Sequence, residues 1–138
     1  MSMQDNKEVV RRYFEEFHSK RTLSLADVIL GPQLRDATMS AAHMLTTAFP
    51  DYQITILDQI VEEDKVATVW KTHGTHERVW MSPMGPIPPT NKSVTWTGTT
   101  TLRLVDGQIS EVIGTNWDHL GILQHMGALS VTIPRSGA

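Results

Sequence analysis

Cysteine is absent from the 138 residues, which excludes disulfide bonds, thiolate nucleophiles, iron–sulfur clusters and zinc sites built on cysteine. Long hydrophobic runs are absent too, so no helix could span a bilayer, and the first residues lack the apolar core of a signal peptide. Basic charge is scarce, since 12 Lys and Arg stand against 15 Asp and Glu. The net charge of −3 predicts no basic face for nucleic acid or a membrane. We therefore expect a cytoplasmic protein that binds neither.

The composition that remains is that of an ordinary globular chain. Apolar residues make up 40% of the sequence and charged residues 20%. The length suits one domain, and such a domain has a core large enough to leave room for a pocket. We expect a single domain over residues 1–138, with flexible ends at 1–5 and 130–138.

Apolar residues at three- and four-residue spacing predict two long helices before any strand. The first should begin near Asn6, because Asp5 and Glu8 resemble a capping box. Its apolar side carries aromatic residues, and Tyr13 is the one expected to show its hydroxyl to a ligand. The other helical stretches expected here are 24–29 and 34–49, which end at Gly31-Pro32 and at Pro50.

Beyond residue 51 the hydrophobic period changes to two, which predicts strands. The segment 81–89 contains four prolines and is expected to be an irregular loop over one end of a sheet. Asp106-Gly107 predicts a hairpin turn. The expected strands are 52–61, 65–76, 93–105 and 108–116, and a last short helix is expected over 119–126.

This order of elements predicts an α+β fold. We expect a cone-shaped α+β barrel, in which a strongly curved antiparallel sheet carries the N-terminal helices on its concave face. Such a cone has a pocket at its open end.

Histidine positions do not predict a metal site. His73 and His76 lie three residues apart on an expected strand, so they point to opposite faces. His119 and His125 are about 240° apart around an expected helix. We therefore expect no metal.

Asp118 stands directly before the apolar residues of the last helix. An aspartate there is a good helix N-cap, which would make it structural. The same carboxylate could work as an acid or base if it lay in an apolar pocket. Asp118→Asn separates these alternatives, because asparagine also caps well.

Four stretches of the chain together carry a family resemblance. They are Phe49-Pro-Asp51, Gly74-Thr-His76, Ile87-Pro-Pro-Thr90 and the segment from Trp117 through Asp118 to Gln124. In this order and spacing the chain resembles the SnoaL-like polyketide cyclases, a branch of the nuclear-transport-factor-two-like superfamily.

The resemblance implies a cyclase that closes a ring of a polyketide-derived aromatic intermediate by intramolecular aldol condensation, without a cofactor. In the family the acidic residue of the Trp-Asp motif is the general acid/base, and that position is Asp118 here. The context this implies is bacterial secondary metabolism such as antibiotic biosynthesis.

Other residues are candidates for the pocket by their side and position. Trp70 and Trp96 lie on the apolar faces of their strands, as core or as walls for a planar substrate. His76 could polarise a substrate oxygen or cap the end of a strand. Asn116 shares a face with Asp118 and could donate to an enolate oxygen. The full set expected to bind substrate is Tyr13, Phe49, Trp70, His76, Trp96 and Asn116.

Two positions depart from the pattern of the resembled family, which often has a second polar partner facing the acid. The corresponding inward positions here are Thr100 and Val112, so a mechanism with a second catalytic residue, Asp or His, is not expected.

Two other functions stay open. One is hydroxylation of a related polycyclic polyketide. The other is a non-catalytic module for small-molecule binding or dimerisation, for which the outward threonines at 95, 97, 99 and 101 could form a surface. Because sheets of this superfamily often pair, a homodimer or homotetramer is expected.

Overall fold

A computed structural model describes residues 2–128 of the chain. Helix α1 (Met3–Arg12) begins at Ser2, whose Oγ accepts a hydrogen bond from the Asp5 backbone at 3.0 Å, while the Asp5 carboxylate accepts one from the Ser2 backbone at 3.1 Å. This reciprocal pair is the capping box, so the helix starts three residues before the predicted Asn6. The predicted pairing of Asp5 with Glu8 is wrong, and Glu8 binds Arg11 instead. The predicted tail 130–138 lies outside the described residues.

The first helix continues without a break into a π-helix, η1 (Tyr13–Ser19). A π-helix places more residues in each turn than an α-helix does. The segment leaves this geometry near Arg21, which has a φ of 57°.

Two short helical elements and one long helix follow. They are η2 (Leu23–Leu25), α2 (Ala26–Ile29) and α3 (Pro32–Ala48). Proline suits the first position of α3, because a backbone N–H at that position has no partner within a helix and its loss costs nothing. These elements confirm the predicted stretches 24–29 and 34–49, with ends that differ by one or two residues.

A four-stranded antiparallel sheet forms the second half of the protein. Its order is β1-β2-β5-β6, with bounds Gln53–Glu62, Lys65–Thr75, Ser93–Val105 and Gln108–Trp117. The turn between β5 and β6 has positive φ at Asp106 and Gly107, as the Asp-Gly pair predicted.

The proline-rich segment is not wholly irregular, which corrects the prediction of a loop over 81–89. Residues Trp80–Ser82 (β3) pair with Gly85–Ile87 (β4) in a small hairpin. Both strands of such a hairpin are edges, so Pro86 can stand where no ladder donor is needed.

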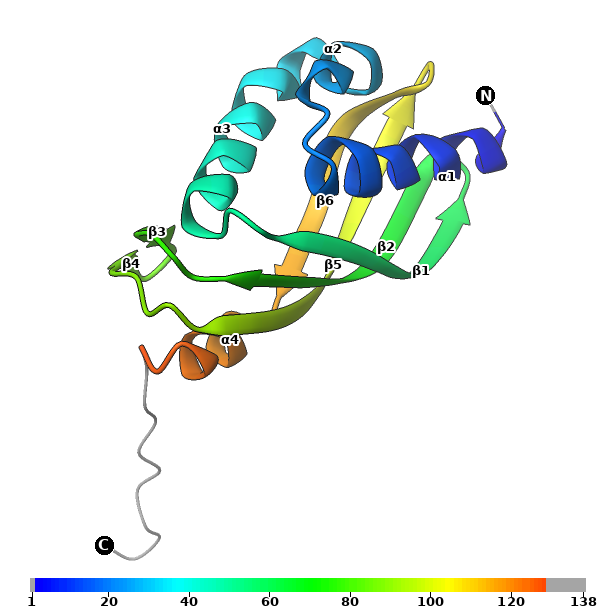
Figure 1. Ribbon diagram of the computed structural model, residues 1–138. Helices are drawn as coiled ribbons and strands as arrows, with labels where there is room; N and C mark the ends of the chain where they lie inside the picture. The colour runs from blue at the N-terminus through cyan, green and yellow to red at the C-terminus, as the bar shows by residue number, and fades with distance from the viewer. Residues whose placement is uncertain (1, 129–138) are drawn as a thin grey trace, which may run out of the picture.

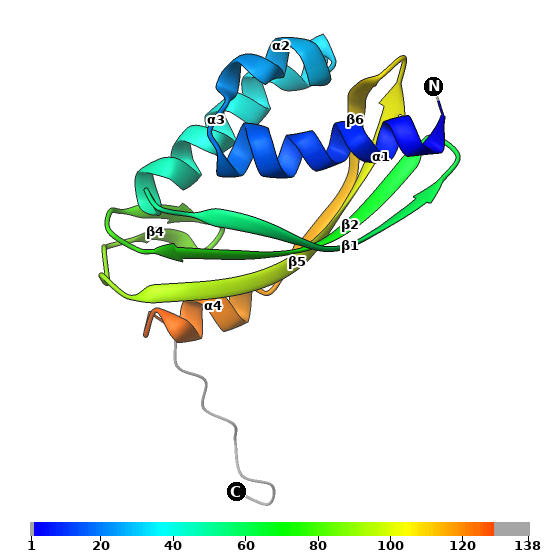
Figure 2. The same ribbon diagram turned by 45° about the vertical axis from the view of Figure 1, so that its right-hand side comes forward.

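The strands and helices form layers (Figures 1 and 2). Helices α1 and α3 lie over the concave face of the twisted sheet, and α4 (His119–His125) lies against β5 on the other side. A hydrogen bond of 2.7 Å from the Gly31 backbone to the Ile109 carbonyl joins the helical layer to β6. Among residues 2–128 no helix is long and apolar enough to cross a membrane.

Candidate functional site

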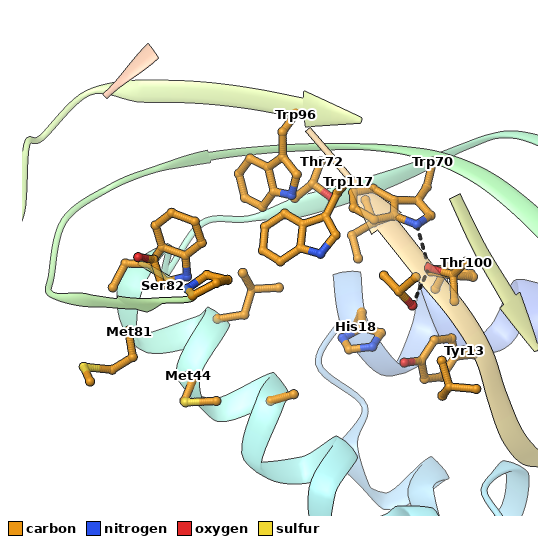
Figure 3. A pocket seen from close by; sticks show the side chains of 18 residues that line it. Tyr13, His18, Met44, Trp70, Thr72, Met81, Ser82, Trp96, Thr100 and Trp117 are labelled. Carbon is orange, nitrogen blue, oxygen red and sulfur yellow. Dashed lines mark hydrogen bonds between the residues drawn. The ribbon is translucent and has the colours of Figure 1, made fainter. Parts of the chain in front are cut away.

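A cavity of about 470 Å³ opens between the concave face of the sheet and the helices η1 and α3. Figure 3 shows side chains from all of these elements pointing into it, with the β3–β4 hairpin at one end and η1 at the other. The volume falls within the range of small-molecule sites, which are mostly apolar with a few polar groups.

All four tryptophans of the chain line this cavity. Trp117 packs against Trp80 and Trp96, with ring centroids 5.9 and 6.3 Å apart. The indoles form flat, apolar walls, and such walls favour a planar aromatic ligand over a flexible aliphatic one.

The Trp70 side chain lies across the neighbouring strand β5, because the residue of β5 that faces Trp70 is a glycine. Gly98 pairs with Trp70, and a Cβ at residue 98 would stand 2.5 Å from the Trp70 ring. The indole Nε1–H then donates to the Thr100 hydroxyl at 2.9 Å, and the Thr115 hydroxyl donates to the same oxygen at 3.4 Å. A polar strip thus crosses the apolar floor of the cavity.

The end of the cavity formed by η1 carries two titratable groups, Tyr13 and His18 (Figure 3). Burial raises the pKa of Tyr13 to about 12. Burial lowers the pKa of His18 to about 4, and the positive charge of Arg21 acts in the same direction. Both side chains are therefore neutral near pH 7 and can donate or accept hydrogen bonds without a charge of their own.

Three residues selected from the sequence, Tyr13, Trp70 and Trp96, do line the cavity. Thr100 and Val112 also face it, as the alternation along β5 and β6 indicated. Their side chains supply no carboxylate to the site.

Phe49 and His76 are placed elsewhere, in the core beside the cavity, because both are fully buried and neither lines it. The His76 Nδ1 accepts from the Thr90 backbone at 3.2 Å and lies 3.0 Å from the Thr90 hydroxyl. Burial lowers the pKa of His76. The His76 ring therefore links the proline-rich segment to the end of β2 by hydrogen bonds. The expectation that His76 contacts the substrate is not met, because the ring does not line the cavity.

Asp118 and Asn116 are both exposed and neither lines the cavity. The Asp118 Oδ1 accepts from the Gly121 backbone at 2.8 Å, which makes it the N-cap of α4. The expectation that this carboxylate lies in a dry hollow is therefore wrong, and the structural alternative describes its position.

A β-bulge in β6 is the physical reason for this placement. Leu102 pairs with Val112, but the preceding residue Thr101 pairs with Gly114, so Ile113 is an extra residue in the ladder. One extra residue turns every later side chain to the opposite face. Thr115 and Trp117 therefore point into the cavity, and the even-numbered positions that follow Val112 point away from it.

Sequence reasoning missed His18, Trp80 and Trp117 as cavity residues. Trp117 belonged to the recognised Trp-Asp stretch, but alternation with Asp118, which was expected in the cavity, would place Trp117 on the opposite face, and only the bulge turns it inward. His18 closes an aromatic-rich stretch of the first helix, but helical periodicity of 3.6 does not place it beside Tyr13. Trp80 carried no signal, because it adjoins the segment that was expected to be irregular.

Comparison with solved structures shows the same fold. A candidate SnoaL-like polyketide cyclase from Jannaschia sp. CCS1 is 19% identical with a TM-score of 0.81, over 93% of this chain and 95% of that one. AclR of Streptomyces galilaeus, described as a candidate hydroxylase, is 24% identical with a TM-score of 0.79, over 97% and 91%. IdmH of Streptomyces antibioticus, a candidate polyketide cyclase, is 21% identical with a TM-score of 0.72, over 88% and 98%.

A search against curated proteins gave no match. The profile of one family, described as SnoaL-like polyketide cyclase, matches residues 2–126, which is nearly the whole chain. With the helices, the sheet and the cavity placed as above, the chain belongs to the SnoaL-like polyketide cyclase family.

Proposed function

We propose that the protein is a cofactor-independent cyclase that closes a ring of a polyketide-derived aromatic intermediate by intramolecular aldol condensation. The observation that carries the proposal is the cavity of about 470 Å³ walled by all four tryptophans, in a chain of this family. Its apolar walls suit the part of the substrate that is already aromatic, and its polar strip suits the carbonyl oxygens.

The first contribution of such a cavity is to hold a flexible chain in a folded conformation. A linear poly-ketone must bring two distant carbons together before it can react. Binding in a shaped cavity supplies that entropy in advance, and pre-organisation of this kind can lower the barrier by several kcal/mol, up to about 7–11.

The chemical step needs one proton acceptor and one proton donor. A C–H bond flanked by two carbonyls loses its proton to a base, and the resulting enolate carbon bonds to a second carbonyl carbon. The oxygen of that carbonyl then takes up a proton. No atom is oxidised or reduced overall, so the aldol step needs no electron acceptor.

The family resemblance would give the proton transfer to Asp118. That role requires the carboxylate to reach the substrate, whereas it caps α4 at an exposed position outside the cavity. The proposal of an aldol cyclase therefore rests on the cavity and not on Asp118.

Incubation with a panel of bicyclic and tricyclic polyketide esters tests the proposal. We expect a product with a new C–C bond, detected by NMR, whose mass is unchanged at the aldol adduct and lower by one water if the adduct dehydrates. Met44→Trp, which fills the cavity, should lower kcat/KM by about tenfold or more. Met3→Trp adds the same bulk at an exposed position of α1 and is the matched control. No conversion across the panel would refute the cyclase.

A second candidate, hydroxylation of a related polycyclic substrate, is favoured by the structural likeness to AclR. It is distinguished by dependence on dioxygen and by incorporation of labelled oxygen into the product. Pairing of two copies through the outward threonine face of β5 stays a prediction, which sedimentation can check.

A further inference from the structure

His18 reaches the cavity because the segment that carries it is a π-helix. Tyr13 and His18 are five residues apart, and their rings lie 4.7 Å apart at an angle of 84°. In an α-helix, residues five apart would be roughly 140° apart around the axis and could not meet. The wider turn brings both onto the face that lines the cavity (Figure 3). Such departures from α-helical geometry are frequent at functional sites.

The imidazole is held firmly and is nearly enclosed. It is 8% exposed, and it packs edge-on against Tyr13 and against Phe17, with a centroid distance of 4.8 Å to the second ring. Its Nδ1 lies 3.4 Å from the hydroxyl of Tyr52, which comes from the segment before β1. Of the two ring nitrogens of His18, only Nδ1 has a hydrogen-bond partner among residues 2–128. Nε2 is therefore left for a ligand in the cavity.

We infer that His18 is the acid–base residue of this cavity, an inference that rests on the proposed cyclase function. Nε2 takes the proton from the carbon between two carbonyls, and the C–H electron pair becomes the enolate. The enolate carbon then bonds to the attacked carbonyl carbon, and Nε2–H returns the proton to the oxygen of that carbonyl. The Nδ1–H donates to Tyr52 throughout, so the ring regains its starting state.

The surroundings of His18 suit a base that is neutral before the reaction. The groups that face it are Tyr13 on its own helix and Tyr52 from the segment before β1, with the positive charge of Arg21 nearby. Burial and that charge hold its pKa at about 4, so the imidazole is free of a proton near pH 7. The imidazolium formed in the step is paired with the enolate, and opposite charges in contact attract strongly in an apolar cavity.

The test uses a bicyclic ketone, 2-tetralone, as a carbon-acid probe in D2O. Binding is measured by tryptophan fluorescence, and proton transfer by the rate of deuterium incorporation next to the carbonyl. We expect the wild-type protein to accelerate exchange. His18→Gln and His18→Asn should each slow the catalysed exchange by about 10²-fold or more, a loss typical of a general base. His43→Gln is the matched control, since His43 is exposed and does not line the cavity.

A readout on the unmodified protein keeps the inference testable if both His18 variants fail to fold. Ring ¹⁵N shifts should show His18 as neutral at about pH 5.5, below the ordinary histidine pKa of ~6.5, and should move when the probe binds. Fixed shifts on saturation would overturn the inference.

The outcomes separate the two proposals. Binding without accelerated exchange, or exchange that is equal in the wild type and in folded His18 variants, overturns the role of His18 and leaves the cyclase cavity standing. Failure of the probe to bind would count against the cavity as a ketone site and so against both.

Discussion

His18 and Asp118 occupy opposite positions relative to the cavity. His18 belongs to no recognised motif, yet it is nearly enclosed and lines the cavity. Asp118 belongs to the stretch that identifies the family, yet it is exposed and caps a helix. In both cases a local change in backbone geometry decides the outcome: the π-helix turns His18 inward, and the bulge at Ile113 turns Asp118 outward. The difference teaches that membership in a sequence motif does not determine where a side chain points. The local geometry of the helix or strand determines that direction.

The largest expected effect concerns the support beneath His18. Phe17 is fully buried and packs edge-on against the imidazole. Phe17→Ala should lower the free energy of unfolding by about 3–5 kcal/mol, because it leaves a cavity in the core. Leu120→Ala in α4, where the side chain is 50% exposed, is the control and should change it by less than about 0.5 kcal/mol. Equal urea midpoints for Phe17→Ala and Leu120→Ala would contradict the contrast between a buried site around His18 and an exposed α4.

The pH dependence of stability is the next largest effect. The pKa of His18 is about 4 in the folded protein and ~6.5 when unfolded, so the unfolded chain binds the proton more tightly. Stability from this residue is complete above pH ~6.5 and falls by about 3 kcal/mol as the pH drops to about 4. Burial of His76 acts in the same direction. Urea titrations should show a flatter curve for His18→Gln, and parallel curves would contradict the burial of His18.

Substitution of Asp118 should have a smaller effect. Asp118→Ala removes the N-cap of α4 and should cost about 1 kcal/mol, whereas Asp118→Asn should cost only a few tenths. Both should keep the turnover of the wild type to within about threefold, far from the ~10²-fold loss expected at His18. A stable Asp118→Asn protein that had lost its turnover would reverse the comparison and return the acid–base role to the carboxylate.

The smallest expected effect is at Gly121. A Cβ there would collide with the Asp118 carboxylate and displace it from the cap. The loss of about 1 kcal/mol offsets the gain of ~1 kcal/mol from alanine over glycine in a helix, so Gly121→Ala alone should be nearly neutral. In the Asp118→Ala background the same substitution should stabilise by about 1 kcal/mol. Additive effects in this double-mutant cycle would show that Asp118 does not cap α4.

Alternation along the strands was the most informative signal in the sequence. It predicted β5 with its observed ends, and it correctly placed Trp70, Trp96 and Thr100 on the strand faces that line the cavity. These predictions hold because one face of each strand is buried and the side-chain period of two is strict. The hairpin turn at Asp106-Gly107 was predicted for a similar reason, since few residues accept positive φ.

The errors share a different cause. The family resemblance assigned Asp118 to the pocket, and alternation then placed Asn116 on the same face. The bulge at Ile113 left no mark in the apolar pattern, so the pattern gave no sign that both residues point away from the cavity. The π-helix likewise reads as an ordinary amphipathic helix, because a single wide turn changes the periodicity of a short segment very little. The β3–β4 hairpin was missed because proline is compatible with an edge strand.

The amino-acid sequence alone determined the α+β order of elements and the apolar face of each long strand, because these follow from hydrophobic periodicity and from residues that fix the backbone. It also determined the family, through the four stretches that carry the resemblance and the profile that matches residues 2–126. Only the tertiary structure decided which polar groups reach the cavity. A bulge or a π-turn shifts the register by a single residue. The free-energy cost of this irregular backbone is offset only by the contacts that it allows between distant parts of the fold. Those contacts join segments as distant as Tyr52 and His18 or Thr101 and Gly114, and no local pattern encodes them.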